Sequence, residues 1–333
     1  MAGCNMKPEL KQTKILITGG AGFIGSNLIE TLLQMDNEVV CLDNFITGKR
    51  ENLAPFLGNP AFRLLEGDIR DFDTCRKAVA NMDYVLHEAA LGSVPRSIAD
   101  PVTSTEINIT GFVNMLFAAV QAKVKRFVYA ASSSTYGDSR ELPKVEDRIG
   151  KPLSPYAITK YANELFAENF SRIYGIETIG LRYFNVFGKR QDPSGAYAAV
   201  IPKFAMSLIR HESPLINGDG SYSRDFTYID NVVQANIRAL LTPNREAVNT
   251  VYNVAFGKRT TLTQLFTCLR DDFSMFDREI AKIAPVYGPE RTGDIPHSLA
   301  DIGKARRLLG YAPEIDVEEG LRRTSRWYFD HLR

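Results

Sequence analysis

Short apolar runs alternate with longer helical stretches through the first half of the chain. Strands are predicted at residues 14–18, 38–42, 62–66, 83–87, 126–131 and 177–182. Helices are predicted between them, near residues 23–34, 71–81, 102–122 and 156–174. Nearly continuous apolar strands separated by helices indicate a parallel sheet that is covered on both faces. The pattern therefore predicts an α/β fold of the doubly wound, Rossmann type, in which ligands bind at the carboxyl ends of the strands.

The alternation becomes irregular after about residue 185, where loops containing Gly and Pro separate shorter elements. Helices are predicted there near residues 198–211, 230–241 and 301–310. The helix at 230–241 and a strand at 251–255 have patterns that also suit the sheet, so we expect a discontinuous domain boundary. We predict a leader over 1–13, a sheet domain over 14–185 with parts of 225–260, and a smaller carboxyl-terminal α/β lobe over 186–333.

Composition and charge narrow the classes of partner. The 333 residues include 40 Lys and Arg against 39 Asp and Glu, a formal net charge of +1. Such a balance gives no global field for nucleic acid or an anionic membrane, so we expect neither as a partner. No apolar run reaches the length of a membrane span, and the first 13 residues lack the apolar core of a signal peptide. We expect a cytoplasmic protein.

Cysteine and histidine residues do not form a metal-binding pattern. The four cysteines are far apart and include no C-x-x-C pair, which is typical of a reducing compartment. The four histidines share no ligand spacing. We expect no metal.

A glycine-rich turn follows the first predicted strand and precedes the first predicted helix. Gly19, Gly22 and Gly25 form a G-x-x-G-x-x-G pattern. Such a turn lets the backbone approach a pyrophosphate, and the helix amino terminus adds N–H groups and a positive dipole end. Asp43 ends the second strand, where a carboxylate can accept hydrogen bonds from ribose hydroxyls and would repel a 2′-phosphate. The sequence predicts NAD rather than NADP, with Asp68 at the same sheet edge.

A tyrosine and a lysine occur one helical turn apart after the fifth strand. The i, i+4 spacing of Tyr156 and Lys160 places both side chains on one face of a helix. A nearby ammonium lowers the pKa of a phenol and makes it a usable proton acceptor. Ser132, Ser133 and Ser134 close the fifth strand and point toward the same crevice. By itself each pattern is also typical of a solvated helix face or an ordinary turn.

Together these motifs resemble the extended short-chain dehydrogenase/reductase family over nearly the whole chain from residue 14. The resemblance rests on the residues named above and on 89–90, 108, 132–137, 156, 160 and 182–188. It implies a catalytic set of Ser133, Ser132, Tyr156 and Lys160. It implies these NAD contacts: Gly19, Gly22, Phe23, Ile24, Gly25, Asp43, Asn44, Gly48, Asp68, Ile69, Ala89, Ala90, Asn108, Tyr156, Lys160, Tyr183 and Val186.

Several branches of that family act on nucleotide sugars, and the end of the fifth strand distinguishes them. Dehydratases and decarboxylases of the family carry a carboxylate there, because their reactions need a further acid or base. Residues 132–135 are three serines and a threonine. This favours a 4-epimerase, which only oxidises a sugar at C4 and returns the hydride to the opposite face. The closest resemblance is to UDP-N-acetylglucosamine 4-epimerases of bacterial surface-polysaccharide pathways.

The resemblance also implies where a UDP-sugar binds. The implied substrate contacts are Ser93, Ser133, Asn185, Gln191, Ala199, Arg224, Arg291, Asp294 and Ser298. Two arginines suit a diphosphate because each guanidinium donates a forked pair of hydrogen bonds. Ser298 stands where epimerases restricted to plain hexoses place a bulky tyrosine, so it leaves room for a 2-acetamido group. A UDP-glucuronate or UDP-N-acetylglucosaminuronate 4-epimerase stays open as an alternative, as does a non-catalytic protein that binds NAD and nucleotide sugars.

The helix predicted over 102–122 bears on the oligomeric state. Phe112, Leu116 and Phe117 recur on it at helical spacing. In the resembled family this helix helps to form a four-helix bundle between two chains, which implies a homodimer. The other interpretation is that the helix only covers the sheet.

Overall fold

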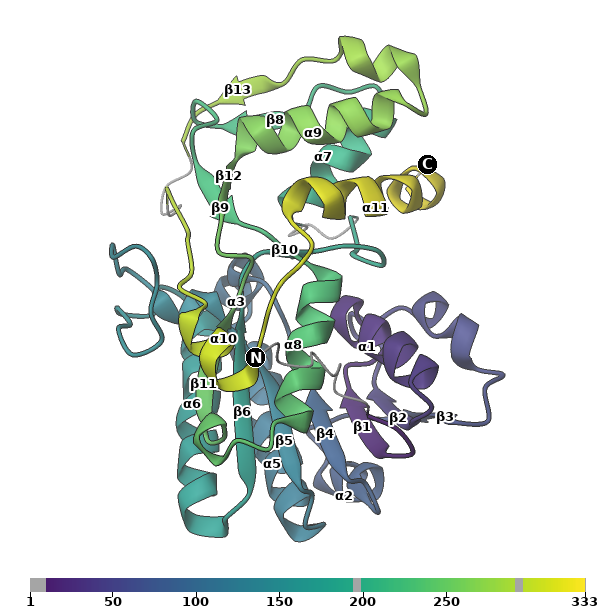
Figure 1. Cartoon of the computed structure of the whole chain (residues 1–333), viewed down its shortest axis with the longest axis vertical. Helices are drawn as coiled ribbons and strands as arrows, with labels where there is room; N and C mark the ends of the chain where they lie inside the picture. Colours follow the sequence, from purple (N-terminus) through teal and green to yellow (C-terminus); the bar gives the residue numbers. More distant parts are fainter. Residues whose placement is uncertain (1–9, 194–198, 291–295, 333) are drawn as a thin grey trace, which may run out of the picture.

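A parallel sheet of seven strands forms the larger part of the molecule (Figure 1). The computed structural model describes residues 10–193, 199–290 and 296–332. Across the sheet the strands run β11 (Thr250–Val254), β6 (Glu177–Tyr183), β5 (Arg126–Ser132), β4 (Tyr84–His87), β1 (Lys14–Thr18), β2 (Glu38–Asp43) and β3 (Phe62–Glu66). The order reverses between β1 and β4, which is the switch point where such sheets bind ligands. The predicted Rossmann-type fold is confirmed.

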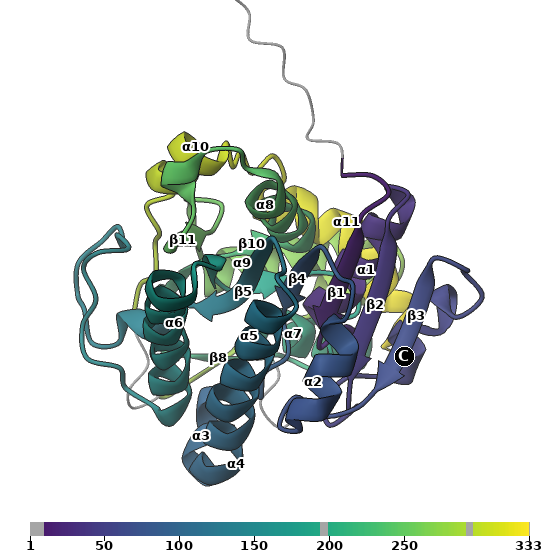
Figure 2. The same cartoon turned by 90° about the horizontal axis from the view of Figure 1, so that it is seen from below.

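Helices cover both faces of this sheet (Figure 2). Helices α1 (Phe23–Gln34) and α8 (Ile229–Leu241) pack on one face, and α2 (Phe72–Val79), α5 (Gly111–Gln121) and α6 (Pro155–Tyr174) cover the other. Fully buried Phe112 of α5 packs against Phe127 and Tyr129 of β5. The predicted strands and helices of the first half lie within a few residues of the observed ones, because strands buried on both faces read as continuous apolar runs.

The helix predicted over 102–122 is divided in the structure. It begins as α4 (Pro101–Thr105), passes through a π-helical turn at Glu106–Thr110 and continues as α5. Asp100 caps α4 by accepting a hydrogen bond from the Thr103 N–H at 3.0 Å. A short helix, α3 (Val94–Ala99), precedes it and was not predicted.

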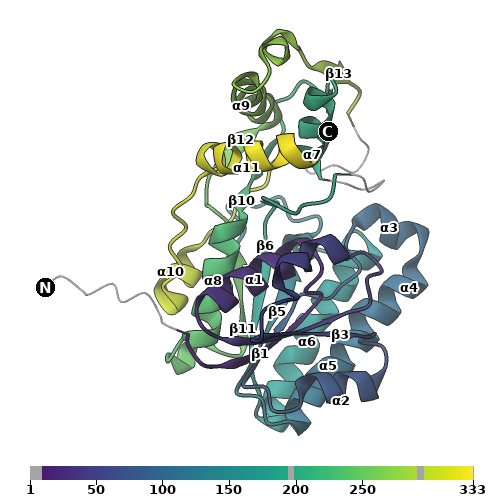
Figure 3. The same ribbon diagram turned by 90° about the vertical axis from the view of Figure 1, so that its right-hand side faces the viewer.

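A smaller lobe lies at the carboxyl edge of the sheet (Figures 1 and 3). Helices α7 (Val200–Ile209), α9 (Leu262–Ser274) and α11 (Val317–His331) pack together there, and α10 (Gly303–Leu309) returns to the sheet. Short strands pair as β8 (Leu215–Asn217) with β13 (Val286–Gly288), β9 (Ser223–Asp225) with β12 (Arg259–Thr261), and β7 (Val186–Phe187) with β10 (Thr227–Tyr228). The sequence predicted α7, α8 and α10 but missed α9 and α11. None of the helices in the described part of the chain is both long and apolar enough to span a bilayer.

A buried ion pair joins α6 to β6 close to the sheet edge. Arg182 donates to both carboxylate oxygens of Glu164, with N–O distances of 2.8 and 2.7 Å. Their side chains are only 3% and 7% exposed. The third guanidinium nitrogen donates to the Glu146 carbonyl at 2.9 Å. Because Glu164 lies one turn after Lys160, and Arg182 adjoins Tyr183, this pair sets the position of both elements.

We predict that Glu164→Gln destabilises the protein, because it leaves the Arg182 charge buried without a counter-ion. The free energy of unfolding should fall by about 3 kcal/mol or more, the usual cost of breaking a buried pair. Urea unfolding followed by circular dichroism measures it. Glu66→Gln is the matched control, since the Glu66–Arg50 pair is more than half exposed and should change stability by about 1 kcal/mol or less. Equal effects of the two substitutions would contradict the assignment.

Candidate active site

The glycine turn after β1 lies directly against the backbone that follows β4. Gly19 has φ +70°, and a Cβ on it would lie 2.7 Å from the backbone of Ala89. A Cβ on Gly25 would lie 2.4 Å from the Gly19 carbonyl oxygen. Helix α1 begins just after Gly22, which supplies no side-chain cap to its N–H groups. The turn therefore presents backbone N–H groups at a helix amino terminus, where an anion such as pyrophosphate binds.

Asp43 is fixed beside this turn at the end of β2. Its carboxylate accepts hydrogen bonds from the backbone N–H groups of Ala21 at 2.9 Å and Phe45 at 2.8 Å. Burial raises the pKa of the carboxyl, and these N–H groups oppose that rise. The arrangement holds the Asp43 carboxylate beside the glycine turn, and its contact with a ribose stays a prediction.

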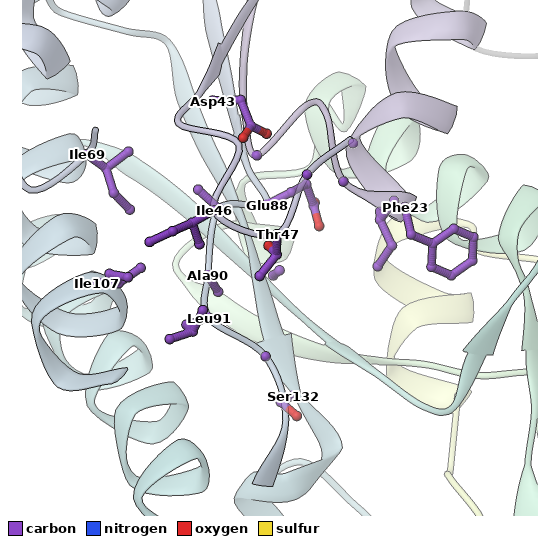
Figure 4. A pocket seen from close by; sticks show the side chains of 18 of the residues that line it. Phe23, Asp43, Ile46, Thr47, Ile69, Glu88, Ala90, Leu91, Ile107 and Ser132 are labelled. Carbon is purple, nitrogen blue, oxygen red and sulfur yellow. The ribbon is translucent and has the colours of Figure 1, made fainter. Parts of the chain in front are cut away.

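A cavity of about 410 Å³ runs along the carboxyl ends of the strands (Figure 4). Most of the predicted residues line it: Gly19, Gly22, Phe23, Ile24, Gly25, Asp43, Asn44, Gly48, Ile69, Ala89, Ala90, Ser132, Tyr156, Lys160, Tyr183, Asn185 and Val186. In the view of Figure 4, Asp43 and Ser132 lie toward opposite ends, with Glu88 between them. The sequence missed these lining residues: Leu42, Ile46, Thr47, Gly67, Glu88, Ile107, Ala130 and Ala131.

Two predicted cofactor contacts lie behind the cavity wall and support it. Asp68 accepts a hydrogen bond from the Asn44 amide at 2.9 Å, and the Arg70 guanidinium beside it lowers its pKa to about 2. Asn108 is buried and bonds both the N–H and the carbonyl of Leu91, at 2.7 and 3.1 Å. These residues hold Asn44 and the loop after β4, and their direct contact with the cofactor stays a prediction.

Of the two candidate serines, the structure brings Ser132 to the cavity. Strand β5 extends to Ser132, whose side chain lines the wall and hydrogen-bonds the Tyr156 phenol. Ser133 begins the next short helix and does not line the wall. The position of Ser132 favours it over Ser133 as the candidate serine, and the role of each stays a prediction.

Local capping fixes the start of α6 and with it Tyr156. Ser154 accepts a hydrogen bond from the Ala157 N–H at 3.1 Å, and Pro155 occupies the first helical position, which its ring favours. The Tyr156 N–H donates to Ser97 Oγ on α3 at 3.0 Å. The unpredicted helix α3 thus takes part in placing the phenol.

Lys160 lies one turn further along α6 and is 3% exposed. Its ammonium donates to the Ala130 carbonyl at 2.8 Å and lies 6.0 Å from the centre of the Tyr156 ring. Burial lowers the pKa of Lys160 to about 8. Burial also raises the pKa of Tyr156, while the Ser132 hydroxyl opposes this rise. A hydroxyl, a phenol and a buried ammonium together can hold an alcohol oxygen and exchange its proton.

A second cavity of about 270 Å³ adjoins the first and shares Asn185 and Val186 with it. The predicted residues Gln191, Ala199 and Arg224 line this second cavity. Arg224 donates to the carbonyls of Ser223 and Pro296 at 3.1 and 3.0 Å, which places its guanidinium at the wall. The cavities together form one path from the glycine turn into the smaller lobe.

Besides Ser133, four predicted substrate contacts do not line either cavity or cannot be placed. Ser93 caps α3 by accepting from the Arg96 N–H at 3.3 Å. The Ser298 N–H donates to the Ser223 carbonyl at 3.0 Å, beside Arg224. Arg291 and Asp294 lie outside the described residues.

The fold and site define a dinucleotide-binding α/β protein with a serine–tyrosine–lysine set at the carboxyl edge of its sheet. Residues 15–255 match the NAD dependent epimerase/dehydratase family, and the chain belongs to that family. The predicted family is thereby confirmed, as are an enzyme of this class and NAD as its cofactor.

Several characterised proteins are similar to the chain over nearly its full length. The UDP-glucose 4-epimerase of Mycolicibacterium smegmatis is 34% identical over 317 residues, covering 95% of this chain and 98% of that protein. A UDP-N-acetylglucosamine 4-epimerase from Methanobrevibacter ruminantium M1, solved with UDP-N-acetylmuramic acid, is 39% identical with a TM-score of 0.89, covering 96% and 99%. A variant of UDP-glucuronic acid 4-epimerase from Bacillus cereus, solved with NAD and a fluorinated UDP-glucuronic acid, is 30% identical with a TM-score of 0.84, covering 96% and 100%.

We predict that Gly25→Ala weakens NAD binding, because the added Cβ would overlap the Gly19 carbonyl and force the turn to move. The dissociation constant, measured by fluorescence titration, should rise by roughly tenfold or more, in line with the usual cost of overpacking. Gly58→Ala is the matched control, since a Cβ there meets nothing within 4 Å. Unchanged affinity in the Gly25 variant would exclude the turn as the pyrophosphate site.

Proposed function

We propose that the protein is an NAD-dependent UDP-sugar 4-epimerase, an isomerase whose main substrate is UDP-N-acetylglucosamine, converted to UDP-N-acetylgalactosamine. One observation carries the proposal. Ser132, Tyr156 and Lys160 meet at the wall of a cofactor cavity that continues into a second cavity. The end of β5 offers serine and threonine where a dehydratase would need a carboxylate. This set supports oxidation at a carbinol carbon and its reversal.

The described residues fit NAD as the resident cofactor. The glycine turn and the start of α1 would hold the pyrophosphate, and Asp43 would hold the adenosine ribose. Lys160 would hold the nicotinamide ribose near Tyr156. NAD, when bound, supplies the acceptor for two electrons and hydrogen from C4 of the sugar and later gives them back. No other reductant is consumed over a cycle, so the cofactor stays bound.

Tyr156 is the proposed acid–base group. As a phenolate it takes the proton of the 4-hydroxyl, and it returns that proton to the 4-keto sugar when the sugar is reduced again. Ser132 holds O4 by a hydrogen bond. The Lys160 ammonium favours the phenolate electrostatically. Its pKa of about 8 means that it loses charge as the pH rises through this range, so activity should fall there.

Inversion requires the 4-keto sugar to present its other face while the nucleotide stays in place. Arg224, at the wall of the second cavity, would grip the diphosphate with its planar fork of donors. Arg291 and Asp294 remain predicted contacts to the diphosphate and the uridine ribose. In this proposal residues 14–185 with parts of 225–260 form the cofactor unit, and the lobe over 186–333 holds the UDP-sugar.

The choice of an N-acetylhexosamine rests on the small side chain at Ser298. Its N–H donates to the carbonyl of Ser223, the residue before Arg224 of the second cavity. A serine leaves space for a 2-acetamido group that a phenol ring would fill. The second candidate is a UDP-uronate 4-epimerase, because the Bacillus cereus enzyme for UDP-glucuronic acid has the same fold over 96% of this chain.

Product analysis tests this function. We predict that the purified protein, without added cofactor, inverts C4 of UDP-N-acetylglucosamine faster than that of UDP-glucose, UDP-glucuronate or UDP-N-acetylglucosaminuronate. NMR of the product mixtures measures the four rates. Tyr156→Phe should abolish turnover yet bind the nucleotide sugar, because it loses only the proton acceptor. A uronate preference would favour the second candidate, and no inversion of any substrate would favour a non-catalytic binding protein.

A homodimer is part of the proposal. Exposed apolar side chains gather on neighbouring helices: Ile98 of α3, Val102 of α4, and Ile158 and Leu165 of α6 are 50–66% exposed. Helices α3 and α4 both pack against α6, and Ile158 and Leu165 share one helix face because they are seven residues apart. Apolar side chains gathered in this way are typical of an interface.

We predict that Ile158→Glu combined with Leu165→Glu converts the protein to a monomer, because the charges would be buried at the interface. Light scattering coupled to size exclusion measures the mass. Leu215→Glu is the control, since Leu215 is 57% exposed in the smaller lobe and should leave the dimer intact. A double variant that stays dimeric would place the interface elsewhere.

A further inference from the structure

Glu88 brings a carboxylate into the wall of the cofactor cavity, and the chemistry proposed above leaves it without a role. It follows β4 directly and lies between Asp43 and Ser132 in the view of Figure 4. Its Oε1 lies 2.9 Å from the Tyr183 hydroxyl. The Asn236 amide donates to that same hydroxyl at 2.9 Å. Because a phenol has one proton, the Asn236 contact directs it to Glu88, which is therefore an acceptor.

The groups that surround Glu88 determine whether its carboxylate is ionised. Lys160 and Tyr156 face it from α6, and Tyr183 faces it from β6. The neighbouring His87 points to the Thr18 hydroxyl, with Nδ1 at 2.9 Å, and burial lowers the pKa of its ring to about 3, so it is neutral. Burial raises the pKa of Glu88 to about 7, while the Tyr183 hydroxyl and the Lys160 ammonium oppose this rise. Glu88 is thus ionised at mildly alkaline pH.

We propose that the Glu88 carboxylate tunes the redox balance of the bound cofactor, by stabilising the cationic nicotinamide of NAD⁺ over the neutral ring of NADH. The inference rests on the proposed function only in placing the nicotinamide beside Tyr156 and Tyr183. When the 4-hydroxyl gives its proton to Tyr156 and C4 gives a hydride to the cofactor, the nicotinamide ring would lose its positive charge. A nearby carboxylate in a poorly solvated wall opposes that loss and favours its reversal.

Such a bias serves an epimerase in particular. A 4-keto sugar that escapes would leave the protein with a reduced cofactor and no means to complete the cycle. Glu88 makes the return of the hydrogen to the sugar the favoured direction. The proposed role of Glu88 is therefore electrostatic. Its charge acts on the cofactor ring, and its side chain need not touch the substrate.

Competition between the two cofactor forms tests the proposal without any sugar. Wild type, Glu88→Gln and Glu88→Asp are allowed to exchange with an equimolar mixture of NAD⁺ and NADH, and the bound ratio is measured after rapid filtration. Glu88→Gln keeps an oxygen acceptor for Tyr183 but removes the charge, and Glu88→Asp keeps the charge. At a pH above the Glu88 pKa, the bound NADH/NAD⁺ ratio should rise by a factor on the order of ten in Glu88→Gln. It should stay near wild type in Glu88→Asp.

The pH dependence provides a second readout. As the pH falls through about 7, Glu88 gains a proton and the wild-type preference for NAD⁺ should weaken, whereas the ratio for Glu88→Gln should stay flat. Glu38→Gln is the control. It removes an exposed carboxylate at the amino end of β2, whereas the cavity lies at the carboxyl ends of the strands, and this variant should behave as wild type. An unchanged ratio in Glu88→Gln would overturn the inference even if the wild type epimerises a UDP-sugar. A changed ratio in a protein that inverts no sugar would leave the inference standing and remove the proposed function.

Discussion

The close approach of two backbones at the sheet switch point makes the site possible. Gly19 and Ala89 lie so near that a single Cβ between them would overlap main-chain atoms. This contact brings the turn after β1 against the loop after β4, and Asn108 holds that loop from behind through Leu91. The cavity is the space that remains at the carboxyl edge once these segments are fixed. The positions of Asp43, Glu88 and the α1 amino terminus all follow from it.

The reacting end of the cavity depends on a different constraint, the docking of α6 on β5 and β6. Lys160 is anchored to the Ala130 carbonyl of β5, and Glu164 one turn later is anchored to Arg182 of β6. One helix therefore carries both the proposed acid–base pair and one partner of the ion pair that fixes its register. A shift of α6 along the sheet would break both contacts, so the geometry of Tyr156 depends on residues that take no part in the chemistry.

The sequence predicted the sheet well because its strands are buried on both faces and can be recognised in the sequence as apolar runs. It named both Ser132 and Ser133, because successive strand residues face opposite ways and the choice between them depends on which residue ends β5. Asp68 and Asn108 were placed at the correct edge, yet spacing cannot tell a wall residue from one that supports the wall. Strands such as β8 and β13 were missed because they have three residues each and pair over a long sequence distance. Glu88 could have been identified from the sequence as a site residue, because it is a carboxylate directly after a predicted strand.

Desolvation connects these observations. Poor solvation raises the pKa values of Asp43 and Glu88 and lowers that of Lys160, so the cavity wall disfavours each charge that it carries. The charges persist because each has a specific partner: N–H groups for Asp43, the Tyr183 hydroxyl for Glu88 and a carbonyl for Lys160. A wall built in this way interacts strongly with any charge that enters, because water does not screen it. The negative charge at Glu88 and the positive charge at Lys160 therefore act on the same reaction from two sides: one on the cofactor ring and the other on the phenol.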